Sequence, residues 1–148
     1  MMTALPAFPI RFRMATYRDL DVLDAADLLA DDVNRLLDAS IRHLIQRAQL
    51  RDCAGSIGAN IAEGMTRRTL EGRNSCLDIS RGEANETIRH LRANYATGRI
   101  TAATFFALRN RLVTIDKMLA RLQRSRFAEP GAAVPADIPR RRAAQQRP

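Results

Sequence analysis

The most informative feature of this sequence is a regular spacing of apolar residues towards its C-terminal end. Apolar residues there recur at alternating intervals of three and four positions: Phe105, Leu108, Leu112, Ile115, Leu119 and Leu122. That spacing puts all of them on one stripe of an α-helix, and it is typical of a helix in the seam of a bundle. Such a helix is stable only when other helices cover its stripe, so partner helices are expected elsewhere in the chain.

Three further segments have the periodicity of helices, and each begins or ends at a residue that commonly marks a helix boundary. The predicted helices span residues 17–38, 40–63, 70–97 and 101–127. Their expected boundary residues are the N-caps Ser40, Thr69 and Thr101 and the terminal glycines Gly64 and Gly98. Short connections favour antiparallel neighbours, so we predict an all-α, up-and-down antiparallel four-helix bundle.

The bundle is expected to occupy residues 17–127 as a single domain. Residues 1–16 have no helical period and residues 128–148 are rich in Pro, Ala and Arg, so we expect a loose extension and a disordered basic tail. No apolar run approaches the roughly 20 residues that span a bilayer, and the first apolar stretch is too short for a signal peptide, which favours a cytosolic protein without membrane contact. Cys53 and Cys76 lack disulfide or metal-site spacing and are expected to be buried thiols.

Two groups of residues predict contacts between subunits. The second predicted helix is crowded with small residues, including Gly55 and Gly58, although a glycine within a helix costs about 1 kcal/mol relative to alanine. Close approach by another backbone would offset that cost. On the last helix, a second apolar row that includes Phe106 and Val113 makes the apolar face wider than one core needs. These four residues are therefore assigned to a subunit interface.

The charge is strongly positive and unevenly distributed. The formal net charge is +8, yet residues 17–38 hold seven Asp against two Arg, a local charge of −5, which leaves +13 on the rest of the chain. A positive charge of this size is typical of proteins that bind nucleic acid or another polyanion. The candidate phosphate-binding residues lie at the turn after the second helix and along the last helix: Arg67, Arg68, Arg73, Lys117, Arg121 and Arg124. A solvated surface and a phosphate-binding surface both remain open at this point.

A recognisable motif lies at the end of the second predicted helix, where residues 49–64 read QLRDCAGSIGANIAEG. This stretch resembles the signature, typically QIRRAAxSIPSNIAEG, of the four-helix-bundle protein family first noticed as reading frames inside intervening sequences of bacterial large-subunit ribosomal RNA genes. The similarity continues through residues 83–87 (EANET) and 98–101 (GRIT). Gly58 stands where the family usually has proline, and Asp52 replaces a basic residue.

The resemblance implies a four-helix bundle that assembles as a homopentamer and has no known catalytic activity. Relatives include the accessory variability protein of diversity-generating retroelements, a basic pentameric bundle that binds nucleic acid and a partner reverse transcriptase. We expect the motif residues to be mainly structural, with Asn60 and Glu63 satisfying backbone groups and the Arg67 guanidinium near a helix end. The alternative is a recognition site made of Asn60, Glu63 and Glu86. The full set of motif residues is Ser56, Ile57, Asn60, Ile61, Glu63, Gly64 and Glu86.

The sequence offers no constellation of residues for catalysis. It has no P-loop, no G-x-S-x-G motif and no serine with a matching His and Asp. A di-iron site in a bundle needs several glutamates and two Glu-x-x-His motifs, whereas Glu86 and His90 are four residues apart and stand alone. We therefore expect no enzymatic activity, no metal and no cofactor.

The favoured hypothesis is a homo-oligomeric protein that binds RNA or DNA mainly through phosphate contacts. It would act as an accessory factor to a reverse transcriptase or a ribosomal RNA element. The alternative is a protein-protein scaffold with no nucleic-acid role, in which the acidic first helix and the basic last helix dock partners.

Overall fold

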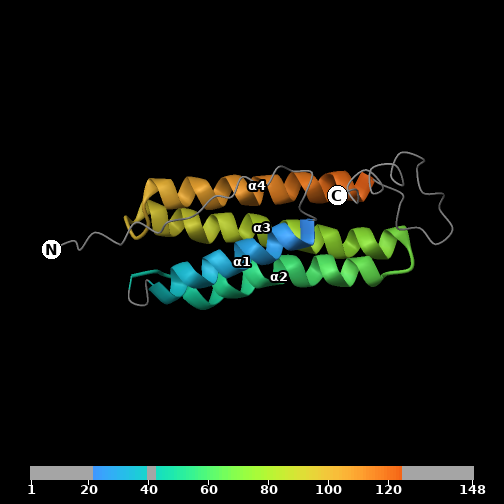
Figure 1. Cartoon of the computed structure of the whole chain (residues 1–148), viewed down its shortest axis with the longest axis horizontal. Helices are drawn as coiled ribbons and strands as arrows, with labels where there is room; N and C mark the ends of the chain where they lie inside the picture. The colour runs from blue at the N-terminus through green and yellow to red at the C-terminus, as the bar shows by residue number, and fades with distance from the viewer. Residues whose placement is uncertain (1–21, 40–42, 125–148) are drawn as a thin grey trace, which may run out of the picture.

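The computed structural model describes residues 22–39 and 43–124, which form four α-helices running alternately up and down. The helices are α1 (Val22–Ala39), α2 (Arg47–Thr66), α3 (Leu70–Ala96) and α4 (Ala102–Arg124). α1 packs on α2 and α4, and α3 packs on the same two helices, so the four close around one core (Figure 1). Within these two ranges no strand occurs, and the predicted antiparallel four-helix bundle is confirmed. The expected N-terminal extension and C-terminal tail lie outside the described residues.

Three of the predicted boundary residues act as expected. Thr69 Oγ1 accepts a hydrogen bond from Gly72 N at 3.0 Å where α3 begins, and Thr101 Oγ1 accepts one from Thr104 N at 3.1 Å where α4 begins. Gly98 follows α3 with a φ of 71°, a left-handed conformation that glycine adopts without strain. Both ends of α3 are therefore set by local sequence.

The start of α2 differs from the prediction. We expected Ser40 to cap this helix, but α2 begins at Arg47, and Ser40 lies outside the described residues. The buried side chain of Asn94 on α3 holds the backbone of Ile45: Ile45 N donates to Asn94 Oδ1 at 2.8 Å, and Asn94 Nδ2 donates to Ile45 O at 3.2 Å. Gln46 then takes a left-handed conformation with φ 54° and ψ 41°. A tertiary contact thus delays the helix, and no local signal in the sequence indicates it.

Gly64 does not end α2, contrary to the prediction. The helix continues to Thr66, and Gly64 lies buried against α3. A Cβ atom at this position would lie 3.1 Å from Cys76 Cβ and 3.3 Å from the carbonyl oxygen of Arg73. The missing side chain therefore lets α2 and α3 approach closely.

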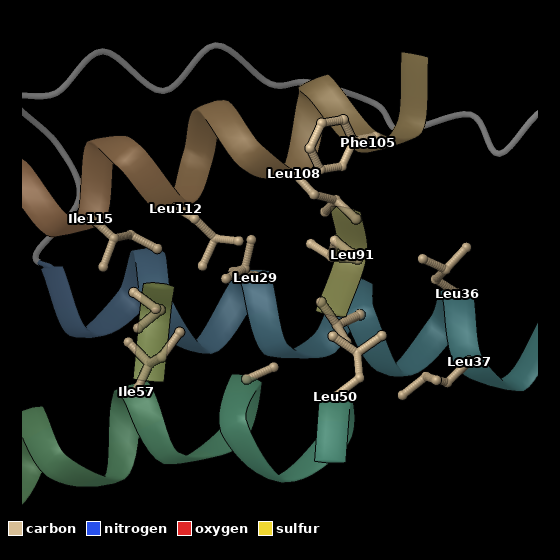
Figure 2. Packing of buried hydrophobic residues seen from close by; sticks show 14 of the residues in the cluster. Leu29, Leu36, Leu37, Leu50, Ile57, Leu91, Phe105, Leu108, Leu112 and Ile115 are labelled. Carbon is tan, nitrogen blue, oxygen red and sulfur yellow. The ribbon is translucent and has the colours of Figure 1, made fainter. Parts of the chain in front are cut away.

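The core contains the predicted apolar stripe of α4. Its buried members are Phe105, Leu108, Leu112, Ile115 and Leu119. Figure 2 shows the first four of these side chains beside apolar residues of the other three helices, among them Leu29, Ile57 and Leu91. Since each fully buried side chain of this kind contributes about 1.5–3 kcal/mol, the stripe makes α4 an integral part of the fold.

α3 adds a polar seam to the same core. Its buried polar residues are Arg73, Ser80, Thr87, His90 and Asn94. Ser80 Oγ donates to Ile57 O at 2.8 Å, and Thr87 Oγ1 donates to Cys53 Sγ at 3.1 Å, so the seam joins α3 to α2. Hydrogen bonds of this kind make the burial of polar groups tolerable.

The cysteines are buried free thiols, as predicted. Burial raises the pKa of Cys53 above its ordinary value of 9.0. Of the helices described, none is long and apolar enough to cross a membrane.

Candidate nucleic-acid interface

The two predicted basic clusters lie at the same end of the bundle. Arg67 and Arg68 are at the turn between α2 and α3, and Lys117, Arg121 and Arg124 are on the last two turns of α4. The C-terminal end of α4 and the N-terminal end of α3 lie at the same end of the bundle (Figure 1). Hydrogen bonds confirm this proximity, because the first turn of α3 donates to backbone carbonyls near the end of α4. Segments about fifty positions apart in the sequence are thus brought to one end of the molecule.

Arg73 is not available for phosphate, and its assignment to the binding site is wrong. The residue is 0% exposed. Its Nη2 donates to Leu122 O at 2.8 Å and its Nε donates to Asn74 Oδ1 at 3.2 Å. A cation near the C-terminal end of α4 is favoured by the helix dipole, so Arg73 joins α3 to α4. The signal for this role is its position four residues before Leu77, in register with the buried stripe of α3.

Arg67 is exposed but already paired. Its guanidinium forms an ion pair with Glu63 one turn earlier, and both side chains are about half exposed. A hydrogen bond with Cys76 and the nearby Glu63 raise the pKa of Arg67. The carboxylate partner reduces the attraction that this arginine offers to a phosphate.

The remaining members of the two clusters are exposed: Arg68, Lys117, Arg121 and Arg124. In the described part of the chain, none of the four forms an ion pair with a carboxylate. Asp116 on the same helix is bound by Arg81 instead, with Nε to Oδ1 at 2.8 Å, and this contact raises the pKa of Arg81. Of the residues predicted to bind phosphate, these four cations are therefore the ones best placed to bind an external anion.

On α4, the predicted basic residues and the predicted interface residues share one face. Six residues follow one another at intervals of four and three and form what we term the outer stripe of α4: Phe106, Asn110, Val113, Lys117, Ala120 and Arg124. Helical geometry places residues with this spacing in one line along the helix. Phe106 is 48% exposed, and Val113 is half-buried. The apolar and basic rows of α4 interleave, so a single ligand could contact both.

The glycines of α2 differ from each other in their surroundings. A Cβ atom at Gly58 would overlap the carboxylate of Asp27 and lie 3.7 Å from Leu23 Cδ1, both on α1. Gly58 is buried and serves the packing of α1 on α2, so its assignment to a subunit interface is wrong. Gly55 is exposed, with no atom within 4 Å of the Cβ position among the described residues, and its interface role stays a prediction.

The polar residues of the sequence motif are engaged inside the chain. Asn60 Nδ2 donates to Ser56 O at 2.8 Å, and Glu63 binds Arg67. Glu86 lies 3.2 Å from His90 Nε2 and 3.3 Å from Arg89. Ile57 and Ile61 are buried in the core. These contacts give the motif residues a structural role within the bundle.

The described residues contain no group of three or more His, Cys, Asp or Glu that could hold a metal ion.

Comparison with known proteins identifies the family of this chain. A family model described as 23S rRNA-intervening sequence protein matches residues 18–121. The chain belongs to this family. Among solved structures, it is similar to a protein of unknown function from the S23 ribosomal protein family of Bacteroides thetaiotaomicron. The two share 26% sequence identity with a TM-score of 0.66, over 71% of this chain and 100% of the other. No curated protein matches the chain.

The residues matched by the family model include every candidate phosphate-binding residue except Arg124. Fifteen of the 24 Lys and Arg residues and twelve of the 16 Asp and Glu residues lie in residues 22–39 and 43–124, which therefore carry +3 of the total charge of +8. Net charge alone is too small to make this bundle a general polyanion binder. What distinguishes the bundle is the position of four exposed cations, which form no ion pair with a carboxylate in residues 22–39 and 43–124.

Proposed function

We propose that this member of the 23S rRNA-intervening sequence protein family is a non-enzymatic, homo-oligomeric protein that binds nucleic acid mainly through phosphate contacts. The observation that supports it is the meeting of four exposed cations without a carboxylate partner in the described residues, from the α2–α3 turn and α4, at one end of the bundle. Arg and Lys side chains in such a cluster favour a ligand with closely spaced negative charges.

Other arginines of the bundle form ion pairs with carboxylates of α1. Arg111 of α4 binds Asp32 of α1 at 2.5 Å, and Arg51 of α2 binds Asp38 of α1 at 3.2 Å. Part of the negative charge of α1 is therefore neutralised within the chain. This weakens the alternative hypothesis, in which an acidic α1 docks a basic partner protein.

The exposed face of α2 supports assembly into an oligomer. Its small exposed residues are Ala48, Gly55, Ala59 and Ala62. Gly55 lies within a helix, where glycine costs about 1 kcal/mol relative to alanine, and no contact among the described residues requires it. Close approach by a second copy would explain the residue. We propose five subunits, as the family resemblance implies, which light scattering would detect as a mass about five times 16.5 kDa.

The binding proposal is tested by two fourfold substitutions that change the charge equally. In the first, Arg68, Lys117, Arg121 and Arg124 become Gln. In the control, Arg35, Arg51, Arg67 and Arg89 become Gln, each an exposed arginine already paired with a carboxylate. Affinity for RNA and DNA of about 12 nucleotides is measured by fluorescence anisotropy over a range of salt concentrations.

The first variant should bind all sequences more weakly, and its plot of log affinity against log salt should flatten by about three units, since each lost phosphate contact removes about 0.7–0.9. The control should change the slope by much less. Equal losses in the two variants would show that no specific cluster binds phosphate. Absence of binding to RNA and DNA by the unchanged protein at about 50 mM salt would overturn the proposal and leave the scaffold hypothesis.

A further inference from the structure

An aromatic cluster lies at the opposite end of α4 from the basic cluster. The rings of Tyr95 on α3 and Phe105 on α4 stack with their centroids 4.9 Å apart and their planes 2° apart. Phe106 meets both rings edge to face, at 5.9 Å from Tyr95 and 5.1 Å from Phe105. These geometries are the favourable ones for aromatic pairs, so the three rings support one another.

Phe106 is the exposed member of this cluster. Phe105 is only 3% exposed and belongs to the core, whereas Phe106 is 48% exposed. About half of the Phe106 side chain therefore stays in contact with solvent, and Phe106 does not belong to the buried core cluster. Because two neighbouring rings hold it in place, Phe106 offers a positioned aromatic surface to a ligand.

Cations lie one turn away on both helices. Arg109 follows Phe106 by three residues on α4, and Arg92 precedes Tyr95 by three residues on α3, spacings that make each pair neighbours on its helix surface. Arg92 is exposed, and within the described ranges it forms no ion pair with a carboxylate. Arg109 donates a long hydrogen bond to Asn110 Oδ1 at 3.5 Å. The aromatic cluster is thus flanked by positive charge.

The same face continues to the basic cluster. The outer stripe of α4 runs from Phe106 through Lys117 to Arg124, a distance of about 27 Å at 1.5 Å per residue. An aromatic ring thus lies at one end of the stripe and phosphate-binding cations lie at the other. Proteins that bind single strands combine these two elements, because unpaired bases stack on aromatic rings while basic side chains follow the backbone.

We propose that the outer stripe of α4 binds single-stranded nucleic acid, with an unpaired base stacked on Phe106 and the backbone running towards Lys117 and Arg124. This inference rests on the proposed function and narrows its ligand class. A duplex keeps its bases stacked on one another, so it could use the cations but not the ring. Single strands should therefore bind more tightly than duplexes of the same length.

The test compares Phe106→Leu with the unchanged protein and with Phe106→Tyr. Leucine keeps an apolar side chain but has no aromatic ring on which a base could stack, whereas tyrosine keeps such a ring. The probes are labelled oligouridylate and oligothymidylate of about 12 nucleotides and a duplex of the same length, a length within the range of known single-strand sites. Circular dichroism and light scattering establish that fold and oligomeric mass are unchanged.

We expect Phe106→Leu to lower affinity for both single strands by roughly 5- to 100-fold, to leave duplex affinity unchanged and to leave the salt dependence unchanged. Phe106→Tyr should restore binding. Lys117→Gln should instead flatten the salt dependence for single strand and duplex alike. Oligonucleotides carrying 5-iodouracil should crosslink to Phe106 or Tyr95 on irradiation.

Each contrary outcome has a distinct meaning. Equal affinity of the unchanged protein for single strand and duplex, together with no effect of Phe106→Leu, would overturn the stacking site but leave the phosphate-binding function intact. A fall in oligomeric mass with Phe106→Leu would identify Phe106 as a subunit contact and would also overturn it. Failure of the unchanged protein to bind any probe would overturn both proposals.

Discussion

Asn94 should be one of the most sensitive positions in the bundle. It is fully buried on α3, and its side chain makes three hydrogen bonds: Oδ1 accepts from Ile45 N at 2.8 Å, and Nδ2 donates to Ile45 O at 3.2 Å and to His90 O at 2.9 Å. Each such bond contributes about 0.5–1.5 kcal/mol, and a buried group left unpaired costs about 1–3 kcal/mol. Asn94→Ala should therefore lower the free energy of unfolding by about 3 kcal/mol.

The matched control for this prediction is Asn85→Ala. Asn85 lies on the same helix but is exposed, and among the described residues its Nδ2 bonds only to Arg81 O, one turn away at 3.1 Å. It should change stability by less than about 0.5 kcal/mol, as surface substitutions usually do. Both variants are measured by urea unfolding at one fixed protein concentration, because the stability of an oligomer depends on concentration.

The loss of the Asn94 side chain should also be detectable locally, at the backbone that it holds. Hydrogen exchange at the amide of Ile45 should accelerate in Asn94→Ala more than exchange in the middle of α4, because only the former amide loses its partner. A loss of stability equal to that of Asn85→Ala, or an Ile45 amide that stays protected, would refute the idea that Asn94 determines where α2 begins.

Three further predictions follow from glycine packing, a buried thiol and the chain ends. Gly64→Ala should destabilise the bundle by about 1–3 kcal/mol, since Cys76 Cβ and the Arg73 carbonyl cannot rotate away. Gly82→Ala, where nothing described lies within 4 Å of the new Cβ, should instead stabilise it by up to about 1 kcal/mol in the same urea assay. Because burial raises the pKa of Cys53 above 9.0, the unfolded chain loses its thiol proton first, so stability should fall as the pH rises above that value. Cys53→Ala should reduce this alkaline fall in thermal melts, and an unchanged profile would count against it. Removal of residues 1–16 and 128–148 should leave the melting temperature nearly unchanged, and a large loss of helicity on truncation would contradict the predicted domain limits.

The fold was predictable because its strongest determinants are local and periodic. The apolar stripe of α4, the caps Thr69 and Thr101 and the left-handed Gly98 each act through neighbours in the sequence, and all are found as expected. The start of α2 was not predictable in this way. It depends on Asn94, which lies 49 positions from Ile45 in the sequence and contacts it only in the folded bundle.

The arrangement of the candidate site was predictable only in part. Arg73 stands between Leu70 and Leu77 at intervals of three and four, the same alternation that identified the α4 stripe, so its burial could have been inferred from spacing. Its charge led to the opposite assignment. The meeting of the α2–α3 turn with the end of α4 follows from antiparallel topology, whereas the ion pair that engages Arg67 depends on a side-chain conformation that spacing does not determine.

Assembly and nucleic-acid binding should respond to substitutions on different helices, α2 for assembly and α4 for binding. Gly55→Leu adds bulk to the exposed face of α2 and should lower the oligomeric mass, because the close approach of a second backbone would be blocked. Phe106→Glu adds a negative charge to the outer stripe of α4 and should weaken single-strand binding while leaving the mass unchanged. Both positions are exposed, so the helical content of each variant should match that of the unchanged protein. The affinities of both variants are measured with an oligonucleotide of about six nucleotides, which is short enough to bind one subunit. A longer oligonucleotide would gain affinity by binding several subunits at once, so its affinity would fall both when the oligomer dissociates and when a contact is lost. If Phe106→Glu instead dissociates the oligomer while Gly55→Leu does not, then Phe106 and Val113 form the subunit interface and the α2 face does not.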